Sequence, residues 1–202
     1  MATKEARRLP DSITDLTDRT VVRPRDLGIS AKAVARLLRD GRLERIAHGL
    51  YEVADADITQ HHTLAQVATV VPSAIVCLIS ALNFHNLGTQ APHGAWIGIE
   101  ARARKPEIEW VTLRVFRFSG AGMTFGVDTH VIEGVPVKVT SRERTVADCF
   151  KYRNKVGLDV AIEALREYLD LPGRSIDALT EASEVRRVYN VMCPYVEALL
   201  AS

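Results

Sequence analysis

The 202-residue chain contains 26 Lys and Arg residues against 25 Asp and Glu residues, and 47% of its residues are hydrophobic. This balance excludes a disordered, collagen-like or coiled-coil chain, and the length suits one large domain or two small ones. A net charge of +1 supplies no overall field that would draw the protein onto nucleic acid or an anionic membrane. Any such partner must therefore be bound through a locally uneven distribution of charge.

The positive charge is concentrated near the N-terminus. Residues 1–52 carry a net charge of +3 and the remainder −2, while the segment from Arg19 to Arg45 alone reaches +5. No apolar run follows the first charged residues, so we expect no secretory signal or membrane anchor and a cytoplasmic protein. The uncharged stretch from Leu64 to Leu82 is long enough to cross a bilayer. Pro72 and Ser73 interrupt it, however, and favour two buried helices.

Residues 1–54 are predicted to form a winged helix-turn-helix domain. The order of elements is a helix, a short helix, a tight turn, a third helix and a two-stranded hairpin, which is typical of that fold. The residues that indicate these elements are Leu9, Ile13 and Leu16 for the first helix, Pro24 and Gly28 for the second, Ser30 and Gly41 for the caps of the third, and His48 and Gly49 for the hairpin turn.

The third predicted helix, residues 31–40, has one basic face. At about 100° per residue, Lys32, Arg36 and Arg39 lie within about 60° of one another, and the apolar residues lie opposite. Such a pattern is most often a solvated helix face. The adjoining turn and the basic hairpin after it favour instead a helix that lies in the major groove of DNA.

Residues 55–202 are predicted to form a second domain of the α+β class, in which helices pack on a small, mostly antiparallel sheet. Two helices open this domain. The first is expected to be capped by Asp57, and the second runs from Ser73 to about Asn86.

A sheet and a helical tail complete the second domain. Strands are expected over residues 95–99 and 110–118, the latter with a bulge at Phe116, and a hairpin over 128–139 turns at Gly134. The tail is indicated by a capping box from Thr140 to Glu143, a break at Gly157, and an N-cap at Ser175 or Asp177.

The sequence contains no recognisable enzyme or metal signature. His61 and His62 are adjacent and cannot both face one metal on a regular helix, and the three cysteines are too far apart for zinc-ligand spacing. We therefore predict no catalytic residue, metal or cofactor. A metal-dependent nuclease stays open as an alternative, in which Glu100, Glu107 and Glu109 would be the acids, although none has the expected lysine two residues later.

A second basic cluster occurs on or near one predicted helix. A helix end that faces solvent is the simpler interpretation, since cations are favoured near a helix C-terminus. A docking face for an acidic partner is the alternative. The cluster comprises Arg142, Arg144, Lys151, Arg153 and Lys155.

The run LGISAKAVARLLRDGRLERIAHGLYEV, residues 27–53, resembles the winged helix-turn-helix of AbiEi-family antitoxins. LISALNFHNLG, VPVKVTSRERTVADCF and GLDVAIEALREYL resemble the family's segments around S-A-L-x-x-H and T-x-x-E-R-T-x-x-D and its following helix. The resemblance extends over nearly the whole chain. Asp40 departs from it, because a base is common at that position.

The resemblance implies a non-enzymatic, two-domain antitoxin. Its first domain would bind inverted or direct repeats of double-stranded DNA in its own promoter, as two copies, and repress it, while the second would oppose a nucleotidyltransferase-like toxin. A transcriptional regulator without a toxin is the alternative. The expected DNA contacts are Lys32, Arg36 and Arg39 to bases and Arg23, Arg25, Arg42 and Arg45 to phosphates, with Ser30 and His48; for the toxin-opposing face we expect Arg142, Arg144 and Lys151.

Overall fold

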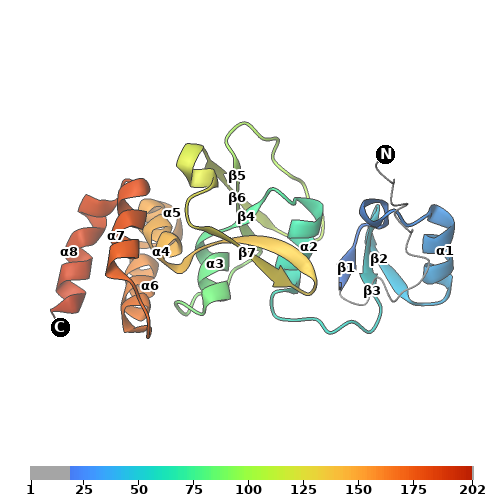
Figure 1. Ribbon diagram of the computed structural model, residues 1–202, viewed down its shortest axis with the longest axis horizontal. Helices are drawn as coiled ribbons and strands as arrows, with labels where there is room; N and C mark the ends of the chain where they lie inside the picture. Colours follow the sequence, from blue (N-terminus) through green and yellow to red (C-terminus); the bar gives the residue numbers. More distant parts are fainter. Residues whose placement is uncertain (1–18, 202) are drawn as a thin grey trace, which may run out of the picture. The chain divides into compact units, whose positions relative to one another are not determined.

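The computed structural model describes residues 19–201, which fold into two compact units (Figure 1). Of the described residues, the first unit contains 19–70 together with Val131–Pro136, and the second contains the rest. Residues 55–70 therefore group with the first unit, whereas the predicted domain boundary lies at residue 54. The first predicted helix, around Leu9, Ile13 and Leu16, lies outside the described residues.

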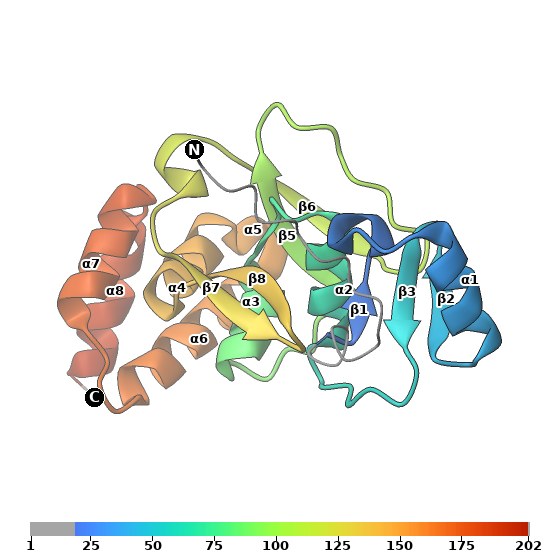
Figure 2. The ribbon, with the colours of Figure 1, turned by 45° about the vertical axis from the view of Figure 1, so that its right-hand side comes forward.

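The first unit contains a three-stranded antiparallel sheet in the order β1-β3-β2. The predicted hairpin is present, with Gly49 in the left-handed region at φ 73° in its turn. Helix α1 lies alongside the hairpin (Figure 2). The elements are β1 Val21–Val22, the 3-10 helix η2 Pro24–Leu27, α1 Ala31–Arg39, β2 Leu43–Ala47, β3 Leu50–Val53 and α2 His62–Val70.

Helix α1 begins and ends as local sequence chemistry predicts. The Ser30 hydroxyl accepts a hydrogen bond from the Ala33 amide at 3.2 Å, which satisfies one of the unpaired amides of the first turn. After the helix, Gly41 adopts φ 67°, a conformation that is strained for other residues. Leu37 packs with Val22 and Leu43 in the small core of this unit, so one helix face is fixed inward.

The second unit is built on a five-stranded sheet in the order β6-β5-β4-β8-β7. β4 pairs antiparallel with β5 but parallel with β8, and β5 pairs parallel with β6. The expectation of a mostly antiparallel sheet is therefore wrong in this respect, and the sheet is mixed. The strands are β4 Ile75–Val76, β5 Ala95–Glu100, β6 Leu113–Phe118, β7 Val127–Ile132 and β8 Val135–Thr140.

Two local predictions for the second unit are also corrected. The predicted helix from Ser73 is instead β4 followed by α3, Leu78–His85, because the buried Ile75 and Val76 occupy the central strand. The expected bulge at Phe116 is absent from the β5–β6 pairing, which keeps one register along β6. In the first unit, likewise, α2 begins at His62 and not at an Asp57 cap.

Five helices follow the sheet, and four of them, α4, α6, α7 and α8, pack together at the orange and red end of the chain (Figure 1). The N-cap of α4 is Ser141, one residue later than predicted, because Thr140 ends β8. Ser175 caps α7, as expected. Within residues 19–201 no helix is both long and apolar enough to cross a membrane. The helices are α4 Arg142–Lys151, α5 Arg153–Val156, α6 Leu158–Asp170, α7 Ile176–Val185 and α8 Tyr189–Leu200.

Candidate nucleic-acid interface

The two faces of α1 separate as the sequence predicts. Lys32, Arg36 and Arg39 are exposed, whereas Val34 and Leu37 are 7% exposed and face the core. The Nε of Arg39 donates to the Ala35 carbonyl at 3.4 Å, which keeps its guanidinium close to the helix surface. The helix thus presents three cations on one accessible face.

The β2–β3 hairpin adds a second set of cations beside α1. Arg42, Arg45 and His48 are all exposed. Arg45 contacts His48 Nδ1 through Nη2 at 3.3 Å, and its Nε donates to the Ala47 carbonyl at 3.3 Å. These contacts hold the Arg45 guanidinium at the hairpin turn. The three side chains come from residues close in sequence, which is why this basic cluster could be recognised from the amino-acid sequence.

The remaining predicted contact residues differ in how free they are to bind DNA. Arg25 is exposed and lies 3.4 Å from Asp26, its neighbour on η2. Arg23 is half-buried, and its Nη1 donates to the carbonyls of Thr69 and Val70 at 3.5 and 3.4 Å. Because those carbonyls lie at the C-terminal end of α2, Arg23 joins η2 and α2 within the first unit. Its proposed phosphate contact stays a prediction, as does that of Ser30, whose hydroxyl caps α1.

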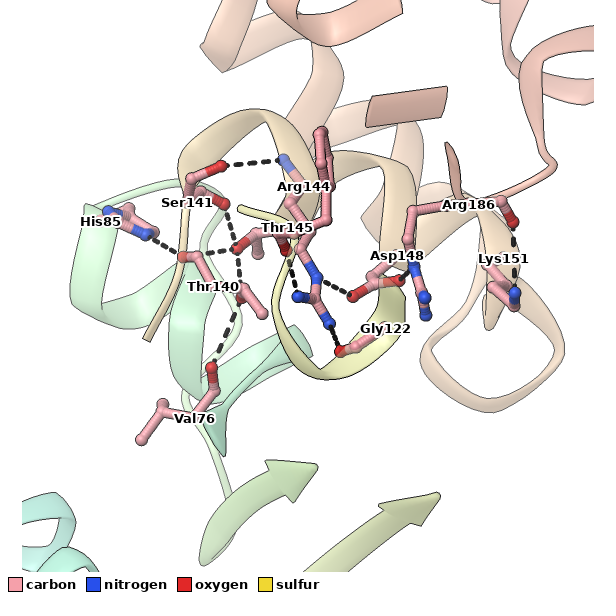
Figure 3. Close-up of polar contacts among 11 residues, drawn as sticks. Val76, His85, Gly122, Thr140, Ser141, Arg144, Thr145, Asp148, Lys151 and Arg186 are labelled. Atoms are coloured by element: carbon pink, nitrogen blue, oxygen red, sulfur yellow. Dashed lines mark hydrogen bonds and ion pairs between the residues drawn. The ribbon is translucent and has the colours of Figure 1, made fainter. Parts of the chain in front are cut away.

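Arg144 is not on an accessible surface, so it cannot belong to the predicted toxin-opposing face in this structure. Its side chain is 0% exposed, and its Nε donates to Asp148 Oδ2 at 3.3 Å. Two further donations go to the carbonyls of Gly122, at 2.5 Å, and Phe125. Figure 3 shows the guanidinium between Asp148 of α4 and Gly122, which lies in the 3-10 helix η3 Gly120–Met123. Arg144 is a structural residue, because its cation is fully used inside the unit.

Asp148 joins Arg144 to a second buried arginine. Arg186, 6% exposed, donates from Nε to Asp148 Oδ1 at 2.5 Å, and both guanidiniums lie over the Phe118 ring at 5.1 and 5.4 Å. Lys151 Nζ donates to the Arg186 carbonyl at 3.2 Å. Partial burial of this ammonium, and then Arg186, lower the pKa of Lys151. Arg142 and Lys151 remain exposed, so their part in opposing a toxin stays a prediction.

Two of the three segments of the second domain that resemble the antitoxin family meet in this region. His85, from the S-A-L-x-x-H segment, donates from Nε2 to the Thr140 carbonyl at 2.7 Å (Figure 3). Thr145 donates to the Thr140 and Ser141 carbonyls at 3.1 and 2.7 Å. Burial lowers the pKa of His85, which favours the neutral ring. The segments therefore have a role in joining α3 to α4.

A polar cluster around Glu133 organises the first unit, and sequence reasoning missed it. The Glu133 side chain is 1% exposed and accepts hydrogen bonds from the Thr20 hydroxyl, from the Thr59 amide and hydroxyl at 2.7 and 2.9 Å, and from His62 Nδ1 at 2.7 Å. Nε2 of His62 lies 3.0 Å from Glu52 of β3. The partners are at least 71 residues from Glu133 in sequence, so no local pattern could reveal them.

We expect Glu133→Gln to lower the stability of the first unit at neutral pH, by about 1–3 kcal/mol, because several donors lose a charged acceptor. Burial alone would raise the pKa of Glu133, but hydrogen bonds from Thr20, His62 and Thr59 outweigh it and lower the pKa. The stabilisation by ionised Glu133 is complete above the ordinary glutamate pKa. It is lost as the pH falls through the lower pKa that Glu133 has in the folded protein. Calorimetric unfolding across that range should show a flatter acid profile for the variant; parallel profiles would contradict the assignment.

A comparison with known protein families identifies the N-terminal segment as similar to a family of transcriptional regulators. Residues 12–54 match the family described as "Transcriptional regulator, AbiEi antitoxin". The resemblance inferred from the sequence is thereby confirmed over this segment. No curated protein sequence matches the chain.

A solved structure has a similar fold over most of the chain. The crystal structure of the RV2827C protein from Mycobacterium tuberculosis aligns with a TM-score of 0.52 and 16% sequence identity, over 96% of this chain and 82% of that chain. At this identity the likeness concerns the fold alone. In the described part of the chain, no group of three or more His, Cys, Asp or Glu residues is arranged to hold a metal.

Proposed function

We propose that the protein is a sequence-specific DNA-binding antitoxin that represses its own promoter in the cytoplasm and counteracts a nucleotidyltransferase-like toxin, without enzymatic activity. The observation that carries the DNA-binding part is the exposed basic face of α1, Lys32, Arg36 and Arg39, beside the basic hairpin. The family match of residues 12–54 supports the same class.

In this proposal the first unit acts as a winged helix-turn-helix. α1 enters the major groove, where guanidinium groups pair with guanine edges and supply sequence readout. Arg25, Arg42, Arg45 and, where it is accessible, Arg23 contact phosphates, which gives affinity without sequence preference. Two copies bound to repeated half-sites would bring two such helices onto one operator.

Titration of a labelled duplex from the region upstream of the gene tests the DNA-binding part. We expect this duplex to bind at least about 10³-fold more tightly than a shuffled duplex of equal length and composition. A linear fall of log K with log salt concentration is also expected. Equal affinities for the two duplexes would refute sequence-specific binding. Cleavage of either duplex with Mg²⁺ or Mn²⁺ present would refute the non-enzymatic assignment.

Arg45→Ala is expected to weaken binding to specific and shuffled duplexes by a similar factor, since Arg45 is assigned to a phosphate. The slope of log K against log salt should fall in magnitude by about one. Glu44→Gln, a change at the exposed neighbour on β2, is the matched control and should not reduce the slope. A loss confined to the specific duplex would instead place Arg45 at a base.

The antitoxin part has a separate test. Co-expression with a nucleotidyltransferase-like protein encoded beside the gene should restore growth, and exchange of Arg142 and Lys151 for alanine should reduce that rescue. If no rescue occurs while promoter binding is intact, the protein is a transcriptional regulator without a toxin.

A further inference from the structure

Three cations lie close together in the second unit, in the loop that joins β5 to β6. Arg102, Arg104 and Lys105 are all exposed there. Among the described residues, none of the three has a hydrogen-bond or ion-pair partner for its side chain. Solvent-facing cations so close in sequence repel one another unless an anion joins them, so the loop is suited to an anionic partner.

The backbone beneath these cations is held in place by a fourth arginine. Arg117, on β6, donates from Nη1 to the carbonyls of Glu100 at 3.2 Å, Ala101 at 3.4 Å and Ala103. The Ala101 amide also donates to the Phe118 carbonyl at 2.8 Å. A fixed backbone reduces the conformational entropy that the loop would lose on binding. The cations are therefore presented from an ordered support.

The acids of the loop lie on either side of the cations. Glu100 ends β5, whereas Glu107 and Glu109 follow Pro106 and flank Ile108, which is 8% exposed. Residues 101–106 thus contain three cations and no acid. The neighbouring exposed residue, Ala101, is small. A protein-docking surface would be expected to offer large apolar or aromatic anchors, which this segment lacks.

We propose that Arg102, Arg104 and Lys105 contact phosphates of the DNA duplex outside the stretch that α1 reads. The inference rests on the proposed DNA-binding function and extends it to the second unit. Because both units belong to one chain, a duplex held by α1 raises the concentration of phosphates around the loop. Guanidinium and ammonium groups bind phosphates without regard to sequence, so the contact adds affinity and length to the site but no base preference.

The test compares a short duplex that contains only the operator with one extended by about 20 base pairs on each side. The full-length protein should bind the extended duplex about tenfold more tightly, with a steeper salt dependence. Changing Arg102, Arg104 and Lys105 together to alanine should remove this difference and lower the salt slope on the extended duplex by about 2.7. Binding to the short duplex should stay the same.

A variant with alanine at Lys155, Arg166 and Arg174, which are also exposed cations of the second unit, is the matched control for the loss of charge. It should bind like the unmodified protein. Equal affinity and slope for the loop variant and the unmodified protein on the extended duplex would overturn the proposal, as would an equal loss in the control. If the loop variant keeps its DNA affinity and loses capture of a toxin, the loop is a protein-docking surface instead. If the unmodified protein binds neither duplex, the proposed function itself fails.

Discussion

Asp148→Asn is expected to lower the free energy of unfolding of the second unit by about 3–5 kcal/mol. Asp148 is 0% exposed and accepts hydrogen bonds from Nε of Arg144 and of Arg186. Asparagine has nearly the same shape but no negative charge, so two buried guanidiniums would face each other without a counter-charge. The loss of a buried acid with two cationic partners is among the most destabilising single changes a core can undergo.

Urea unfolding followed by tryptophan fluorescence measures the free energy of unfolding of the second unit. The protein has two tryptophans, Trp96 and Trp110, and both belong to the second unit. Asp170→Asn, at the exposed end of α6, is the control and should change the stability by less than about 0.5 kcal/mol. If the two variants unfold at the same urea concentration, the buried ion network contributes little to stability.

Changing both Arg36 and Arg39 to alanine is expected to weaken binding to the specific duplex by about 100-fold or more. Each well-placed arginine contact to a guanine edge contributes about 1–3 kcal/mol of discrimination. Both residues are on the exposed face of α1, and alanine is the best helix former, so the fold should be unaffected. Binding to shuffled DNA should fall much less, since phosphate contacts from the hairpin remain.

Competition titrations with specific and shuffled duplexes separate the two effects, and circular dichroism checks that α1 is intact. Arg166 and Arg174, exposed in the second unit, provide a double-alanine control of equal charge. Retention of the full specificity ratio by the Arg36 and Arg39 variant would show that α1 does not read the bases. An equal loss on both duplexes would place these residues at phosphates.

Features set by neighbouring residues could be predicted from the sequence. The Ser30 cap of α1, the hairpin turn at Gly49 and the β7–β8 turn at Gly134 each depend on a few adjacent residues. The charged and apolar faces of α1 follow from helical periodicity alone. The candidate DNA interface is assembled almost wholly from such local features, which is why its residues could be named in advance.

Features that depend on distant residues could not be predicted. Ile75 and Val76 read as part of an apolar helix, because periodicity does not distinguish a short buried strand from a buried helix. Their parallel pairing with Lys138 and Val139 of β8 makes them a strand. Arg144 looked like a surface cation because charged residues are seldom fully buried, and its acceptors Gly122 and Phe125 come from another segment.

The position of Glu133 in the first unit has a consequence for how the protein can be divided. The chain passes between the units after Val70, enters the first again at Val131 and leaves it after Pro136. A fragment that ends at Val70 would lack Glu133 and leave Thr20, Thr59 and His62 without their common acceptor. An isolated N-terminal fragment of the first unit would thus be incomplete, and a protease that cuts the β7–β8 turn would damage the unit from a site more than 60 residues downstream of Val70.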